Sequence, residues 1–153
     1  MQLIPVKSAA AREIATSLWF RIFTEEPFWV KKYVLNHIYD PKFRKNRPGQ
    51  PYFVVYHYNK PIGLTGIYKN KKTGDYWLGW FGILPEYQGS GIGSKVLEAT
   101  IKELKSIHPN VTYFNLWTEG GRAVQNFYRK NGFKYTGKLI DSKTNARTYG
   151  KTI

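Results

Sequence analysis

The sequence contains no cysteine, which excludes disulfide bonds, thiolate metal sites and covalent catalysis through a cysteine nucleophile. Acidic residues are scarce: 10 Asp and Glu stand against 24 Lys and Arg, and the formal net charge is +14. No run of about 18 apolar residues occurs, and residues 1–7 lack the pattern of a signal peptide. We therefore expect a cytoplasmic protein without membrane association.

A chain of 153 residues can bury one hydrophobic core, so a single domain is expected over residues 1–153. The positive charge favours polyanions in general, including nucleic acid, an acidic membrane and a phosphorylated cofactor. Aromatic residues make up 17% of the chain, and basic clusters occur at residues 42–45 and 69–72. Because nucleic-acid-binding modules combine basic and aromatic residues, composition alone leaves that class open.

Hydrophobic periodicity predicts alternating groups of strands and helices. Helices are expected after Ser8, after Thr24 and over residues 92–107 and 122–130. The expected strands are residues 3–6, 52–58, 62–68, 75–83, 111–117, 133–140 and 146–153. Gly79 and Gly82 interrupt residues 75–83 and suggest a bulge or a close backbone approach. Basic residues, proline and glycine over residues 40–51 indicate a solvated loop. This order predicts an α+β fold with a mixed, mostly antiparallel sheet of about seven strands and helices on both faces.

A glycine-rich turn joins the fourth predicted strand to the next helix. Residues 88–93 read Gln-Gly-Ser-Gly-Ile-Gly and follow Leu-Pro-Glu-Tyr. Such a turn presents backbone N–H groups at the positive end of a helix dipole, which suits a pyrophosphate. The spacing fits neither the phosphate loop of nucleotide triphosphatases nor the dinucleotide fingerprint. Taken alone, the glycines are equally compatible with a tight turn that lets the helix and the strand pack closely.

Two landmarks resemble those of the GNAT family of N-acetyltransferases. Residues 88–93 are similar to the family signature Gln/Arg-x-x-Gly-x-Gly/Ala, and residues 127–133 are similar to Phe/Leu-Tyr-x-x-x-Gly-Phe, in the family's order. The resemblance implies the acyl-CoA N-acyltransferase fold with acetyl-CoA as the acetyl donor. It also implies direct attack by a primary amine in a ternary complex, without a metal.

The resemblance further implies roles for particular residues. Tyr128 corresponds to the tyrosine that protonates the departing thiolate, and a phenol with an ordinary pKa near 10 stays protonated at neutral pH. Core packing is the alternative role for Tyr128. Lys95 and Lys130 are candidates for the outer phosphates, with simple solvation as the alternative. The implied cofactor-binding residues are Phe81, Gly82 and Ile83 for the pantetheine arm, and Gln88, Gly89, Ser90, Gly91, Ile92, Gly93 and Ser94 for the pyrophosphate.

The attacking amine must lose a proton, so a carboxylate is expected near the acetyl group. Glu25, Glu26 and Asp75 are the candidates. Residues 24–27 (Thr-Glu-Glu-Pro) also look like a helix start, where acidic side chains are stabilising without any catalytic role. The apolar face of that helix would consist of Phe28, Trp29, Tyr33, Val34 and Ile38. Asp75 lies beside a predicted turn and is expected to serve it.

One position departs from the family's pattern, and two alternative functions are compatible with the sequence. Gly121 stands seven positions before Tyr128, where many relatives have an asparagine, so an asparagine contact to the pantetheine arm is in doubt. A catalytically silent CoA-binding protein and a basic nucleic-acid-binding module are the alternative functions. Both basic clusters lie in predicted turns, where solvated charge is ordinary, so we do not expect a nucleic-acid partner.

The acceptor is expected to be a small-molecule or peptide amine, and a homodimer is a further option. Positive charge would favour an acidic or phosphorylated acceptor if it extends into the cleft. Four aromatic residues are candidates for the acceptor pocket, with core packing as the alternative: Trp29, Tyr33, Trp77 and Trp80.

Overall fold

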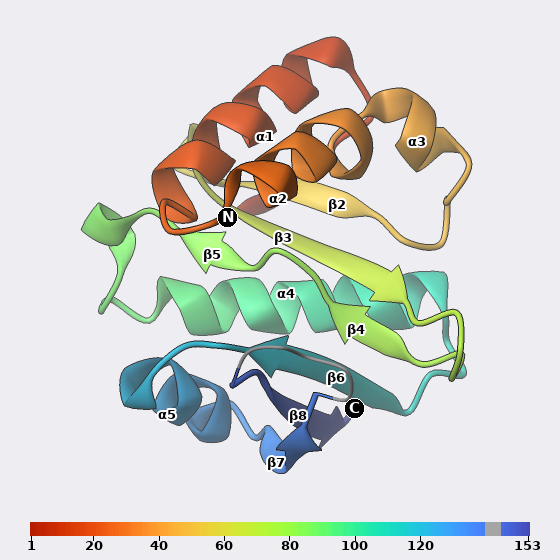
Figure 1. Ribbon diagram of the computed structural model, residues 1–153, viewed down its shortest axis with the longest axis vertical. Helices are drawn as coiled ribbons and strands as arrows, with labels where there is room; N and C mark the ends of the chain where they lie inside the picture. Colours follow the sequence, from red (N-terminus) through yellow and green to blue (C-terminus); the bar gives the residue numbers. More distant parts are fainter. Residues whose placement is uncertain (140–144) are drawn as a thin grey trace.

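The computed structural model describes residues 1–139 and 145–153, and its centre is one mixed sheet (Figure 1). The strands follow the order β1-β2-β3-β4-β6-β8-β7, and β5 pairs separately with β3. Only the β4–β6 pair is parallel among the described strands. The predicted α+β class and mostly antiparallel sheet are confirmed. The strands are β1 (Gln2–Pro5), β2 (Tyr52–His57), β3 (Lys60–Lys69), β4 (Tyr76–Leu78), β5 (Gly82–Ile83), β6 (Tyr113–Thr118), β7 (Lys134–Lys138) and β8 (Arg147–Thr152).

Capping residues mark the start of the first helix and the end of the last one. The Ser8 hydroxyl accepts a hydrogen bond from the N–H of Ala11 and caps the first helix as predicted. Gly132, with a φ of 86°, follows the last helix and ends it. The predicted Asp141 to Asn145 turn lies almost entirely outside the described residues. The helical segments are α1 (Ala9–Ile22), α2 (Phe28–Tyr33), the π-helical turn η1 (Val34–Ile38), α3 (Pro41–Lys45), the 3-10 turn η2 (Pro85–Tyr87), α4 (Ile92–Ile107) and α5 (Arg122–Lys130).

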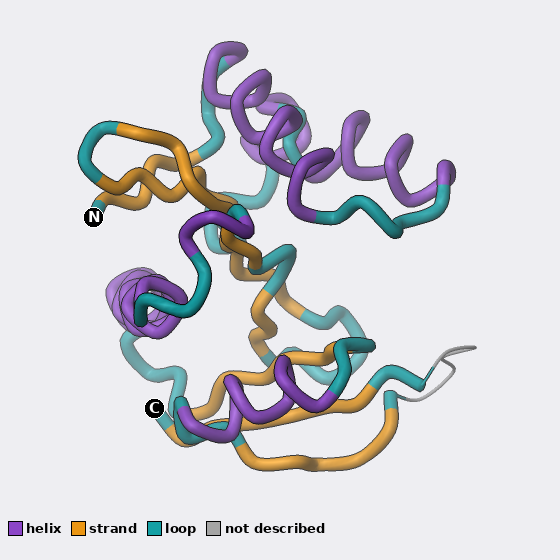
Figure 2. Tube along the Cα trace, turned by 90° about the vertical axis from the view of Figure 1, so that its left-hand side faces the viewer, coloured by secondary structure: helices purple, strands orange, loops and turns teal. Residues whose placement is uncertain are grey.

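The sheet is covered by helices on both faces, as predicted. Neighbouring residues of a strand point to opposite faces. Val54 therefore packs with Trp19 of α1 on one face, and Phe53 packs with Leu97 of α4 on the other. Figure 2 shows α4 end-on, on the opposite side of β3 from α1. None of the described helices has the length and apolar character needed to cross a bilayer.

A buried hydroxyl pair joins α4 to the sheet. The Thr100 hydroxyl donates to the carbonyl of Val96 at 2.8 Å, so its lone pairs are left to accept. The Thr65 hydroxyl on β3 lies 2.8 Å from the Thr100 oxygen and is the donor in that contact. Both threonines are fully buried, and the pair fixes the position of α4 on the strand beside the splayed centre of the sheet.

The predicted strand over residues 75–83 is interrupted, and the bulge that its glycines suggested is present. It divides into β4 and β5, because the chain bulges between them. The N–H of Gly79 bonds to the carbonyl of Gly66, whereas Gly82 pairs with Leu64, so three steps on one strand oppose two on β3. At the bulge Trp80 has a φ of 42°, which is rare for a bulky residue. Its ring is held edge-on by Trp19 at 5.4 Å.

Three further predictions are corrected in the region before β2. The second helix does not start at residues 24–27: Pro27 is its N-cap, and no acidic residue lies in its first turn. Its predicted apolar face is also wrong in part, because Phe28 and Trp29 are 80% and 73% exposed. The expected loop over residues 40–51 contains α3, because Asp40 accepts from the N–H of Lys42 and proline occupies the first helical position.

Candidate active site

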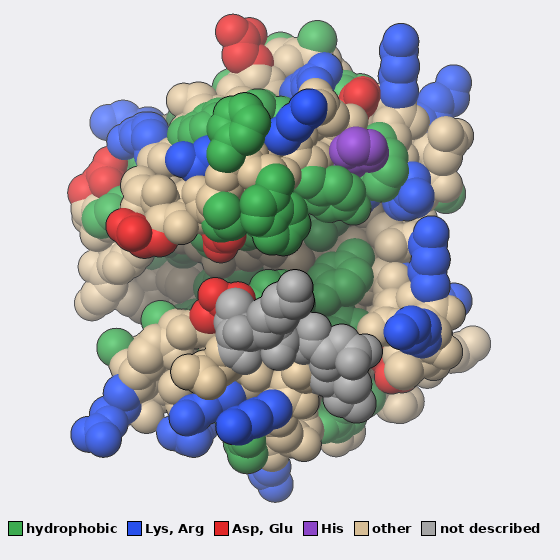
Figure 3. Space-filling model, viewed as in Figure 1, with side chains coloured by type: hydrophobic (Ala, Val, Ile, Leu, Met, Phe, Trp, Pro, Cys, Tyr) green, Lys and Arg blue, Asp and Glu red, His purple; other side chains and the backbone are tan. Residues whose placement is uncertain are grey.

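A cavity of about 530 Å³ lies where β4 and β6 separate. These strands share the single register pair Trp77 and Asn115 before they diverge. Residues 78–81 form one wall and residues 116–120 form the other, while Tyr128 of α5 contributes from between them. Figure 3 shows this hollow between the upper and lower halves, with acidic side chains on both rims and lysine and arginine side chains gathered at one end.

The glycine-rich loop leads from β5 through η2 into α4. Gly89 and Gly91 have φ values of 78° and 82°, and a Cβ at either position would meet no atom within 4 Å. Glycine is therefore required by the backbone conformation, and the space beside it is open. In the part of the chain that the structure describes, the N–H groups of residues 89–94 have no hydrogen-bond acceptor. They lie at the positive end of a 16-residue helix, which fits a pyrophosphate group.

Other residues of the loop have structural partners. The Gln88 side-chain amide donates to the carbonyl of Ile83 at 2.9 Å, and the Ser90 hydroxyl donates to the carbonyl of Tyr87 at 3.0 Å. A Cβ at Gly93 would lie 3.2 Å from the Phe127 ring of α5. The glycines therefore have two structural roles: Gly93 permits close packing, whereas Gly89 and Gly91 shape the donor-rich turn.

The main-chain groups of Gly82 and Ile83 point to opposite edges of β5. The N–H of Leu84 bonds to Ile62, so Gly82, two residues earlier, also directs its main chain toward β3. Ile83 faces the opposite edge, where its carbonyl accepts from Gln88. Of the three strand residues implied for the pantetheine arm, Phe81 and Ile83 remain as candidates, and Gly82 is already paired with β3.

Tyr128 lies inside the cavity wall and is 6% exposed. Its ring packs against Phe81 at 6.3 Å and Phe133 at 6.1 Å, so the core-packing role holds. Because the side chain also lines the cavity, that role does not exclude a catalytic one. Burial raises the pKa of Tyr128 above the ordinary phenol value, which keeps the hydroxyl protonated at neutral pH.

The carboxylate candidates are separated by the structure. Glu26 lines the cavity, whereas Glu25 is exposed and does not. Asp75 is exposed in the β3–β4 turn, where its N–H bonds to Thr73. A further carboxylate, Glu119, was missed: it lines the cavity directly after β6. Burial, and then the negative charge of Glu119, raise the pKa of Glu26.

The sequence around Glu119 carries a signal for its position in the cavity wall. Glu119 is an acidic residue at the carboxyl end of a predicted strand, directly before Gly120 and Gly121. Gly120 is needed there, because a Cβ would lie 2.7 Å from Val124. No atom of residues 1–139 and 145–153 lies within 4 Å of a Cβ at Gly121, so none of their side chains replaces the asparagine that many relatives have at that point.

Aromatic and basic side chains complete the cavity at the end formed by α2, α3 and the β3–β4 turn. Two of the four predicted acceptor-pocket aromatics, Tyr33 and Trp80, are in the lining, whereas Trp29 and Trp77 are not. Arg44 and Arg47 were not predicted, because residues 40–51 were interpreted as a loop. Other residues at this end are Phe43, Tyr52, Tyr68, Lys69, Lys71 and Trp117.

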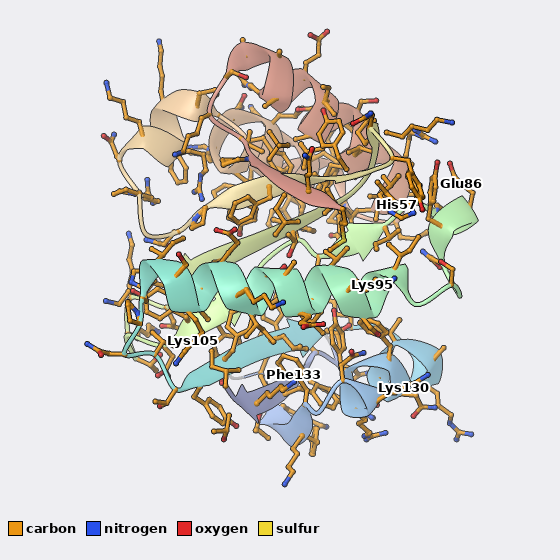
Figure 4. All side chains as sticks on the ribbon, turned by 180° about the vertical axis from the view of Figure 1, so that it is seen from behind. His57, Glu86, Lys95, Lys105, Lys130 and Phe133 are labelled. Atoms are coloured by element: carbon orange, nitrogen blue, oxygen red, sulfur yellow. The ribbon has the colours of Figure 1, made fainter. Side chains whose placement is uncertain are left out.

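The two lysines considered for the outer phosphates share a second groove. Lys95 of α4 and Lys130 of α5 line it together with Lys102 and Lys151. Figure 4, seen from behind, shows Lys95 near the first turn of α4 and Lys130 on α5 below it. Both lie on the side of the loop where α4 begins, so they remain candidates. In the described residues, no group of three or more His, Asp and Glu side chains could hold a metal ion.

A splayed sheet, a donor-rich glycine turn and a buried tyrosine define the class of N-acyltransferase folds. A sequence profile of the acetyltransferase (GNAT) family matches residues 9–133, and the chain belongs to that family. Spermine/spermidine N(1)-acetyltransferase of Bacillus subtilis (strain 168) is 30% identical over 99 residues, covering 54% of this chain and 64% of that protein. The match thus leaves more than a third of that relative's length uncovered.

Solved structures agree on the fold. An acetyltransferase from Streptococcus agalactiae 2603 superposes with a TM-score of 0.77 at 16% identity, covering 99% of this chain and 98% of that one. The PaiA N-acetyltransferase from Thermoplasma acidophilum, solved in complex with coenzyme A, gives a TM-score of 0.66 at 17% identity and covers both chains completely. At these identities the likeness shows the fold alone.

Proposed function

We propose that this protein transfers an acetyl group from acetyl-CoA to a primary amine. One observation carries the proposal: Tyr128 and Glu26 line the same cavity, which opens beside the bulge that leads to the glycine turn. Acetyl-CoA is the donor used by the family to which the chain belongs. The free N–H groups of residues 89–94 would hold its pyrophosphate, and Phe81 and Ile83 would bind the arm.

When bound, acetyl-CoA supplies a thioester carbonyl that an amine can attack. Glu26, with Glu119 beside it, accepts the proton that the amine loses as the new C–N bond forms, directly or through a water. The raised pKa of Glu26 makes it a stronger base than an exposed carboxylate. The Tyr128 hydroxyl donates its proton to the departing sulfur as the C–S bond breaks, and solvent then restores the tyrosine.

The absence of cysteine supports transfer without an acetylated cysteine and also provides a clean assay. A thiol reagent detects only the coenzyme A released, since the protein contributes no thiol. The test is thiol release from acetyl-CoA with a panel of amines: alkylamines, amino acids, an N-terminal peptide, aminoglycosides and polyamines. We expect amine-dependent release by the wild type and loss in Tyr128→Phe.

Two outcomes would contradict the proposal in different ways. Micromolar binding of acetyl-CoA without turnover of any amine indicates the catalytically silent alternative. Absence of acetyl-CoA binding removes the enzyme proposal altogether, and salt-dependent submicromolar affinity for DNA or RNA would then favour the nucleic-acid alternative. Polyamines belong in the panel because the Bacillus subtilis relative is named for spermine and spermidine.

A further inference from the structure

We infer that the acceptor is a primary amine that carries an anionic group, carboxylate or phosphate, which docks on Arg44 and Arg47 while its amine faces Glu26 and Glu119. The inference rests on the proposed function and specifies the substrate class of the same cavity. Its basis is the unequal distribution of charge between the two ends of the cavity.

Arg44 is a buried cation with no acidic partner among the residues that the structure describes. It is 8% exposed and lines the cavity, yet its Nε is buried without a hydrogen-bond partner. One of its terminal nitrogens donates to the carbonyl of Gln50 at 2.7 Å. The ion pairs found among the described residues, Arg21 with Glu86 and Lys102 with Glu98, lie elsewhere. A buried guanidinium with no carboxylate beside it is destabilising until an anion arrives.

Arg47 adds a second guanidinium to the same place. Its group lies 3.7 Å from the centroid of the Phe43 ring, and that of Arg44 lies 5.0 Å from the same centroid. The two like charges are close enough that Arg47 lowers the pKa of Arg44, although burial is the larger cause. Ring contacts and a carbonyl hold both side chains in position. Because these two guanidinium groups are held in place and repel one another, they form a site for a carboxylate or a phosphate.

Other charged residues of the cavity are also unevenly distributed. Lys69 and Lys71 line the cavity with the two arginines, and the Lys69 N–H bonds to Gln50, whose carbonyl accepts from Arg44. Glu26 and Glu119 also line the cavity and are close enough to interact electrostatically. In Figure 3 the blue side chains gather at one end of the hollow and the red ones lie along its rims. A polyamine would place a second cation against Arg44 and Arg47, and the repulsion between like charges would weaken its binding. An amine with an anionic group at its far end can pair with Arg44 and Arg47 while its amine faces Glu26 and Glu119.

The test measures binding apart from turnover, with matched probes that differ only in the anion. β-Alanine is compared with propylamine, γ-aminobutyrate with butylamine, phosphoethanolamine with ethanolamine, and spermidine is included as a polycation. Each is titrated calorimetrically into CoA-saturated protein at one salt concentration, and the fluorescence of Trp80 and Trp117, which line the cavity, provides a second readout. The carboxylate and phosphate arms identify which anion fits.

For at least one anionic probe we expect binding about 10- to 100-fold tighter than that of its uncharged partner. Arg44→Gln and Arg47→Gln should remove that advantage. The matched control is Lys45→Gln, which removes one positive charge from an exposed residue of the same helix, outside the cavity. It should change the affinity by no more than about threefold. If Arg44→Gln fails to fold by circular dichroism, the half-buried Arg47→Gln decides alone.

Several results would overturn the inference. These are equal or tighter binding of the alkylamines or spermidine, an anion advantage that survives both arginine substitutions, or no detectable binding of any anionic probe. Failure of the proposed function is recognised separately, because it appears as loss of acetyl-CoA binding or of thiol release with every amine. An enzyme that prefers spermidine would keep the function and refute only the anionic acceptor.

Discussion

The proposed site has a cofactor end, at the glycine turn, and an acceptor end, in the cavity, and the two are built differently. At the cofactor end the chemistry comes from the backbone: the free N–H groups of residues 89–94 and the main chain beside the bulge at Trp80. At the acceptor end it comes from side chains such as Arg44 and Glu119, carried by segments far apart in the sequence. The first end should therefore be sensitive to backbone conformation and the second to the identity of single side chains.

The largest effect is expected where the two ends meet. Tyr128→Phe removes only the hydroxyl, so the ring packing against Phe81 and Phe133 is kept. Loss of a general acid lowers kcat about 100- to 1000-fold while acetyl-CoA affinity is unchanged. Steady-state thiol release and calorimetry measure the two quantities. The control is Tyr135→Phe, a half-exposed tyrosine on β7, which should keep full activity. An unchanged kcat in Tyr128→Phe would exclude the general-acid role.

A smaller effect is expected for the carboxylates of the acceptor end. Glu26→Gln should lower kcat/KM about 10- to 100-fold at neutral pH, because the amine loses its proton acceptor. In the wild type the acid limb of the pH–rate profile should lie above the ordinary carboxyl range, since burial and Glu119 raise the pKa of Glu26.

The neighbouring carboxylate provides a check on that assignment. Glu119→Gln removes the charge that raises the pKa of Glu26, so the acid limb should move to lower pH. Glu25→Gln is the matched control, since Glu25 is adjacent in sequence but lies outside the cavity. An acid limb that does not move in Glu119→Gln would assign the limb to a different group.

The same pair makes a prediction about stability. A carboxyl group with a raised pKa in the folded state binds its proton more tightly there, so the wild type loses stability as pH rises through that pKa. Glu26→Gln should therefore raise the free energy of unfolding at neutral pH. The gain should be under about 1 kcal/mol, because Glu26 is only half-buried. It should vanish below the ordinary carboxyl pKa. Thermal unfolding over a pH series measures it, and a gain that grows at acid pH would contradict the assignment.

The smallest effect is expected at the last glycine of the turn. Gly93→Ala places a Cβ 3.2 Å from the Phe127 ring but also favours the helix, so stability should change by less than about 1 kcal/mol. Acetyl-CoA affinity should stay within about threefold. Gly91→Ala, at a φ of 82°, should weaken binding more, because alanine disfavours that conformation. Equal effects at the two positions would remove the distinction between packing and cofactor glycines.

The difference between the ends also explains how much the sequence could predict. The glycine turn and the segment around Tyr128 are contiguous motifs, and the periodicity of α4 and of most strands is local, so the secondary structure of these segments was predicted correctly. Their roles in binding and catalysis stay predictions. The acceptor end depends on α3, whose start at Asp40 and Pro41 is a capping signal that was outweighed by the basic, proline-containing composition. The placement of Arg44 in the same cavity as residues of β4 and β6 depends on tertiary packing, which local patterns do not encode.

The bulge is a second feature beyond local prediction. Gly79 and Gly82 suggested an irregularity, but the positive φ of Trp80 and the edge-on packing of its ring on Trp19 of α1 were not predicted. Trp19 and Trp80 are 61 positions apart, so local patterns do not reveal this contact. This division of β4 from β5 creates the wall that the cofactor arm would follow.

The most direct measurement is calorimetric titration of acetyl-CoA into the wild type, Gly91→Glu and Gly74→Glu. Both variants place the same side chain on a glycine of nearly equal φ, 82° and 76°, but Gly74 lies in the β3–β4 turn, away from the helix terminus. The account predicts micromolar binding by the wild type and Gly74→Glu, and loss of at least about 100-fold in Gly91→Glu with the fold retained. Equal affinity of all three proteins would contradict it, because the glycine turn would then not hold the pyrophosphate.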